Sequence, residues 1–192
     1  MLLQLDAMSL AMPDIVGHPN RLPFRGVLTL VGVASQRSPA GARGHRVMLT
    51  RAATENALPS LLGMALDYAP SLAAHDARHK IGIISEAEIV PLHAGASPFS
   101  PVVGERVGSY SPVGQIAVTG YIFAKDFPDL VDEIRAQQRN TLGMSYEIAD
   151  ATVPNQEAFI WTVTNFTFTG AAVLHRDKAA YPQTWIALAS TY

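Results

Sequence analysis

Two polar residues in the segment GMSYE, at positions 143–147, could carry chemistry. Ser145 and Glu147 are two residues apart, so a strand would place both side chains on one face, opposite the apolar Met144 and Ile148. A serine hydroxyl is a nucleophile when a base activates it. A strand serine that only packs, on a face open to solvent, is the simpler alternative.

The GxSxG turn of α/β-hydrolases resembles this segment, but the two differ at one glycine position. Glu147 stands where that motif has its second glycine, and apolar residues continue beyond it as a strand rather than a helix. The sequence therefore disfavours an α/β-hydrolase.

Histidine is the side chain best suited to act as a base near neutral pH. The chain has six histidines. His75 and His79, in AAHDARHKIG, have the spacing of a helical zinc pair, and His93 is the nearest third ligand. This spacing keeps a metal-dependent hydrolase open, while a surface imidazole before a strand is the alternative for His75.

Several other classes lack their signatures. The chain has no glycine-rich phosphate loop, dinucleotide fingerprint or HExxH motif, and it has no cysteine. A net charge of -2 argues against general nucleic-acid binding. No run approaches the ~18 apolar residues of a membrane span, so we expect a soluble cytoplasmic protein with no membrane partner and no cofactor.

The elements that must position these residues follow from hydrophobic periodicity. We expect one folded domain over 23–192, preceded by a flexible N-terminal arm or leader over 1–22. The count of strands and helices predicts an α+β fold, a mainly antiparallel, barrel-like sheet with two or three packed helices, with a doubly wound parallel fold as the alternative. The expected strands are 24–34, 46–50 paired with the first, 80–90, 115–125, 142–153, 158–174 and 184–190; the expected helices begin near Leu58 and span 127–140, and a long loop covers 91–114.

The order of four motifs resembles the phage prohead proteases, the serine proteases of capsid maturation. These motifs are AHDARHKIG, VTGYIFAKDFPDLVDEIRAQQ, LGMSYE and FTGAAVLHRDKAAY, and the resemblance covers about residues 24–189. It implies a fold like that of the herpesvirus assembly protease, a mainly antiparallel β-barrel wrapped by helices.

The resemblance also implies roles for individual residues. His75 matches the family's histidine and Ser145 its nucleophile. Relatives have an acid or a second histidine on the strand after the serine, where this chain has Thr169. His175 and Asp177 follow a few residues later, so the third member stays open; we favour Glu147. Backbone N–H groups or a basic side chain such as Arg176 would form the oxyanion hole.

The resulting hypothesis is a serine endopeptidase that cleaves scaffolding protein and the major capsid protein inside the assembling procapsid, in the host cytoplasm. Self-cleavage and a homo-oligomer are compatible with it. A non-catalytic scaffold-core module of the same fold is the main alternative, and a metal-dependent hydrolase using His75, His79 and His93 is the third.

Overall fold

A computed structural model describes residues 7–9, 11, 13, 15, 17–92, 113–136 and 141–188 of the chain. These residues form an α+β fold, which confirms the predicted class. The elements are β1 (Ala7–Ser9), β2 (Leu22–Val31), β3 (Arg46–Leu49), α1 (Arg51–Ala57), the 3-10 helix η1 (Leu58–Leu61), β4 (Ala65–Tyr68), β5 (Lys80–Pro91), β6 (Gly114–Ile122), α2 (Pro128–Ala136), β7 (Leu142–Thr152), β8 (Ile160–Val163), β9 (Asn165–His175) and β10 (Trp185–Leu188).

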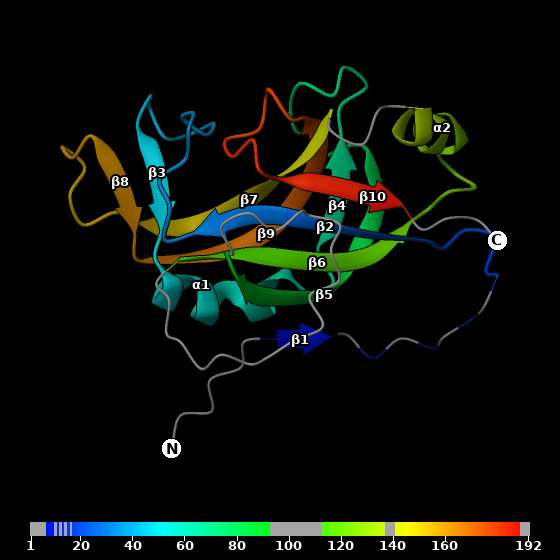
Figure 1. Cartoon of the computed structure of the whole chain (residues 1–192), viewed down its shortest axis with the longest axis horizontal. Coiled ribbons are helices and arrows are strands. Elements are labelled where there is room, and N and C mark those ends of the chain that lie inside the picture. Colours follow the sequence, from blue (N-terminus) through cyan, green and yellow to red (C-terminus); the bar gives the residue numbers. More distant parts are fainter. Residues whose placement is uncertain are drawn as a thin grey trace.

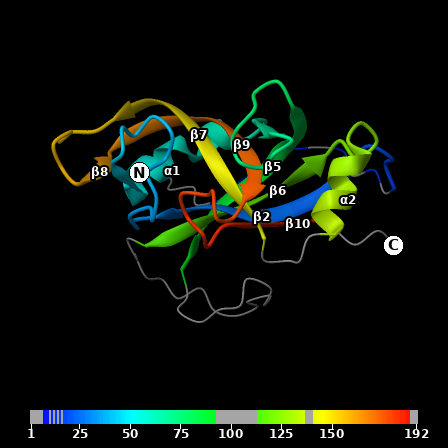
Figure 2. The same cartoon turned by 90° about the horizontal axis from the view of Figure 1, so that it is seen from above.

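Most strands belong to one eight-stranded sheet, in the order β10-β2-β6-β5-β4-β9-β7, with β1 beside β5. Neighbours are antiparallel except β4 and β9, which run parallel. The sheet curls until β7 packs against β2 and β10, giving a half-barrel (Figures 1 and 2). Gly26 of β2 permits this approach, because a Cβ there would lie 2.6 Å from Met144 Sδ.

The inner face of the curled sheet forms the core. Leu58 and Leu61 of η1 are fully buried, and Ser60 Oγ accepts a hydrogen bond of 2.8 Å from the backbone N–H of Phe168 on β9. Helix α2 buries an apolar stripe of three residues, Leu130, Val131 and Ile134. None of the helices in the described part of the chain is long and apolar enough to cross a membrane.

The first helix begins earlier than the sequence predicts. Thr50 caps α1, since its Oγ1 accepts a hydrogen bond of 3.3 Å from the N–H of Ala53. Leu58, the predicted start, instead opens the short η1, where Pro59 lies in the first turn and needs no N–H partner. The prediction overlooked the cap at Thr50.

The predicted pairing of residues 46–50 with the first strand is only partly correct: the N–H groups of Gly32 and Ser35 donate to the carbonyl oxygens of Leu49 and Val47 at 2.9 and 2.8 Å, but no antiparallel ladder forms there among the described residues. β3 pairs in parallel with β8, a partner more than a hundred residues away along the chain. The predicted strand 158–174 is accordingly two strands: β8 pairs with β3, and β9 pairs with β7. Residues 93–112, most of the predicted long loop, and 137–140, the end of the predicted second helix, lie outside the described residues.

Candidate active site

A row of three residues crosses the strands β4, β9 and β7. Asp67 is the register partner of Ala172, and Ala172 is the partner of Ser145. Register partners on neighbouring strands project to the same face. Asp67 and Ser145 therefore flank the small Ala172 on one face of the sheet.

Glu147 lies on this face too, two residues beyond Ser145 on β7. Its carboxylate extends over Gly170 of β9, where a Cβ would lie 2.6 Å from Glu147 Oε2. A register irregularity follows directly after Glu147, so the alternation of side chains is regular from Ser145 to Glu147. The glycine at position 170 leaves the space that this carboxylate occupies.

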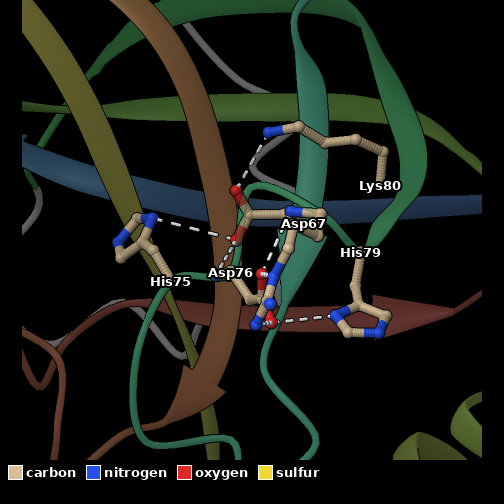
Figure 3. Close-up of polar contacts among 6 residues, drawn as sticks. Asp67, His75, Asp76, His79 and Lys80 are labelled. Atoms are coloured by element: carbon tan, nitrogen blue, oxygen red, sulfur yellow. Dashed lines mark hydrogen bonds and ion pairs between the residues drawn. The ribbon is translucent and has the colours of Figure 1, made fainter.

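The loop between β4 and β5 brings His75 to the same place. Its Nδ1 atom lies 3.1 Å from Glu147 Oε1 and 3.9 Å from Asp67 Oδ1. The ring therefore lies on the face that carries Ser145, and Figure 3 shows Nδ1 directed at Asp67 with the other ring nitrogen pointing away from that carboxylate. Nδ1 is buried without a hydrogen bond to any described residue, so the ring has carboxylate neighbours but no fixed donor–acceptor geometry.

Asp67 is the residue of this group that the sequence analysis missed. Its side chain is 0% exposed, and it accepts hydrogen bonds of 3.2 Å from the Asp76 N–H and 3.3 Å from Lys80 Nζ (Figure 3). The signal was an acid inside the apolar segment MALDYA, 64–69. Buried carboxylates need partners, so such a residue warrants attention.

The side chain of the neighbouring Asp76 holds its own loop and does not contact His75. It accepts hydrogen bonds from Arg78, through the backbone N–H at 3.0 Å and Nε at 3.1 Å, and its other oxygen lies 2.9 Å from His79 Nδ1. The hydrogen bonds from Arg78, with a further contribution from His79, hold the pKa of the Asp76 carboxyl well below its usual range. His79 therefore contacts Asp76, whereas the nearest carboxylate to His75 is that of Glu147.

A metal ion is the second chemistry that the cluster could support. One donor atom each from Asp67, His75 and Glu147 lie within 4.8 Å of one another, a set different from the predicted His75, His79 and His93. The Lys80 ammonium, 3.3 Å from the Asp67 carboxylate, opposes a bound cation there. His93 lies outside the described residues.

Among the residues considered for the third catalytic member, Glu147 is the one whose carboxylate approaches His75. Thr169 is exposed at the register irregularity of β9. His175 ends β9 three residues after Ala172, so strand alternation directs it to the opposite face. Asp177 is exposed and pairs with Lys178 at 3.7 Å.

The backbone of Arg176 lies beside the start of β7, where its N–H donates a hydrogen bond of 2.8 Å to the Thr141 carbonyl oxygen. Its Cα would be 3.3 Å from a Cβ on Gly143, which precedes Ser145 by two residues on the same face. The Nε atom of Arg176 is buried with no hydrogen-bond partner among the described residues, and this burial lowers the pKa of the guanidinium. An unpaired donor of this kind suits an oxyanion.

The opposite face of β7 anchors the strand that carries these groups. Tyr146 points inward between Ser145 and Glu147, and its ring packs edge-on against Phe168 with centroids 6.2 Å apart. Burial raises the pKa of the Tyr146 hydroxyl well above its usual value, so this group stays neutral. Ser145 Oγ makes no hydrogen bond, to His75 or to any other residue, within the described part of the chain.

A hydroxyl, an imidazole and two carboxylates thus lie on one face of β4, β9 and β7. Such a set can activate a nucleophile by general-base catalysis. Comparisons of the chain with protein-family models, with curated proteins and with solved structures found no match.

Proposed function

We propose that this chain is a serine endopeptidase of phage capsid assembly, with Ser145 as nucleophile, His75 as general base and Glu147 as the acid that supports His75. The observation that carries the proposal is the 3.1 Å approach of His75 Nδ1 to Glu147 Oε1, on the face of β7 that also presents Ser145. With Nδ1 beside a carboxylate, Nε2 is the nitrogen left to serve the hydroxyl.

The reaction follows from these positions. Ser145 Oγ attacks the peptide carbonyl carbon while its proton passes to His75 Nε2, and the tetrahedral intermediate carries a negative oxygen that Arg176 or backbone N–H groups stabilise. The intermediate collapses when His75 returns the proton to the leaving amine. Water, deprotonated by His75, then hydrolyses the acyl-enzyme and regenerates the Ser145 hydroxyl.

The substrates follow from the resemblance to the prohead proteases. We take them to be the scaffolding protein and the major capsid protein, cleaved inside the assembling procapsid, on a fold akin to the herpesvirus assembly protease. The curled, mainly antiparallel sheet with packed helices agrees with the α+β class, but it is a half-barrel and not the closed β-barrel that the resemblance implies.

Co-expression with the major capsid protein and the scaffolding protein of the same phage tests the proposal. The readout is the intact mass of every product. We expect wild type and the control Ser38→Ala, an exposed serine, to yield the same truncated products, and Ser145→Ala to yield none. Cleavage that persists in Ser145→Ala contradicts the proposal.

Two outcomes of the same experiment would support the alternatives. Capsids that assemble equally well with wild type and Ser145→Ala, without any truncation, favour a non-catalytic assembly module. Cleavage that EDTA abolishes favours a metal-dependent hydrolase at the Asp67, His75 and Glu147 cluster.

A further inference from the structure

The two carboxylates beside His75 differ in how firmly they are held. The Asp67 side chain is 0% exposed, whereas that of Glu147 is 29% exposed. Asp67 also has two fixed donors, the Asp76 N–H and Lys80 Nζ, and the first of these belongs to the residue directly after His75. Asp67 therefore ties the backbone of the His75 loop to β4.

We propose that Asp67 is a positioning residue that fixes the orientation of the His75 ring for catalysis. Lys80, paired with Asp67, partly neutralises the negative charge that acts on this ring. This inference rests on the proposed function and assigns Asp67 and Lys80 a part in it. The Glu147 side chain is more exposed, so its carboxylate is the less firmly held partner of the ring.

Preorganised charge explains why a buried acid suits this task. A carboxylate that is already desolvated and hydrogen-bonded needs no rearrangement when the imidazolium forms. The 3.9 Å between His75 Nδ1 and Asp67 Oδ1 is longer than a hydrogen bond, and catalytic hydrogen bonds are often long until substrate binds. A small rotation of the ring would bring Nδ1–H to Asp67.

The charged groups around His75 predict the direction in which the protonation of its imidazole changes when one of them is removed. The groups that face it are Asp67 from β4, Glu147 from β7 and Lys80 from β5 behind Asp67, with Asp76 on its own loop; β9 contributes the uncharged Gly170 and Ala172. Carboxylates favour the imidazolium, and Lys80 offsets Asp67. Removing Lys80 should therefore favour the charged ring, and removing the Asp67 charge should disfavour it.

The test is the pH dependence of kcat/KM for peptide cleavage in wild type, Asp67→Asn, Lys80→Met and the double variant. We expect Asp67→Asn to lower kcat about tenfold or more with little change in KM, because ring orientation is lost. Its acid limb should move to lower pH. Lys80→Met should move the acid limb to higher pH by about half a unit, and the double variant should fall close to Asp67→Asn.

Two controls separate this effect from general loss of charge or fold. Lys80→Arg keeps the cation and should show the same acid limb as wild type. Arg37→Met removes an exposed cation between β2 and β3 and should leave the acid limb in place. If Asp67→Asn fails to fold, the expected shift of the acid limb to higher pH in Lys80→Met still tests the proposal.

The failure of this inference is distinguishable from the failure of the proposed function. An active wild type with an unchanged rate and acid limb in Asp67→Asn, or an unmoved limb in Lys80→Met, overturns the positioning role alone. If wild type cleaves nothing, the protease proposal falls, and NMR titration of the His75 imidazole in the same variants gives the sign test without substrate. A titration midpoint that moves in neither variant would then overturn the positioning role as well.

Discussion

Two histidines of this protein have contrasting surroundings. His45, just before β3, stacks on Trp161 of β8 with ring centroids 4.5 Å apart, and its Nδ1 lies 3.0 Å from the Ala158 carbonyl oxygen. His75 instead faces the carboxylates of Glu147 and Asp67. The His45 imidazole stacks on an aromatic ring and has a neutral polar partner, whereas the His75 imidazole has two carboxylate neighbours. The partners of a histidine therefore tell more about its role than the residue type does.

The largest expected effect comes from exchanging the two histidines for alanine. His75→Ala should lower the rate of peptide cleavage by about a thousandfold, because the base is lost, with a small change in melting temperature. His45→Ala should keep the cleavage rate and lower the free energy of unfolding by about 1–2 kcal/mol, because the stacking and the hydrogen bond are lost. Cleavage assays and urea unfolding measure both quantities.

The comparison between the two histidine regions fails if the two variants behave alike. A His75→Ala protein that is mainly unstable, or a His45→Ala protein that is folded but inactive, would reverse the roles assigned to these regions.

A smaller effect is expected from Glu147→Gln, which keeps the shape of the side chain and removes its charge. The cleavage rate should fall about tenfold to a hundredfold, since the imidazolium loses its nearer carboxylate while Asp67 remains. Circular dichroism should show an unchanged fold. Near-wild-type cleavage would remove Glu147 from the mechanism and leave Asp67 as the carboxylate partner.

The smallest effect concerns Asp76, which supports the loop from outside the catalytic group. Because Arg78 lowers the pKa of Asp76 below the usual 3.8, its carboxylate contributes stability above pH 3.8, and this contribution is lost as the pH falls further. Asp76→Asn should therefore lower the melting temperature slightly at pH 7 and by a smaller amount at pH 2. Asp177→Asn, an exposed acid with a 3.7 Å ion pair, is the matched control and should show no such pH dependence. A deficit of equal size at both pH values would exclude the charge as its cause.

Local patterns in the sequence were sufficient for the serine side of the site. The alternation along LGMSYE predicted that Ser145 and Glu147 share a face, and β7 has that geometry. The acid Asp67 was missed because β4 has only four residues, too few to show a period, and because its parallel partner β9 lies about a hundred residues later. Which residues of the β4–β5 loop approach β7 depends on this long-range pairing.

The same limit explains the errors in the fold. The strand prediction for residues 46–50 was correct, but its partner β8 is distant in sequence, and a hairpin with the first strand was the simpler local solution. The cap at Thr50 is a local signal, but the prediction of a helix from Leu58 rested on the leucine spacing.

Labelling of the purified protein with a fluorophosphonate tests the central claim most directly, because it requires an activated serine and no knowledge of the substrate. We expect peptide mapping to place a single adduct on Ser145, and we expect His75→Ala to abolish it while His45→Ala retains it. Absence of an adduct on Ser145 in the folded wild-type protein, or equal labelling in His75→Ala, would contradict the account.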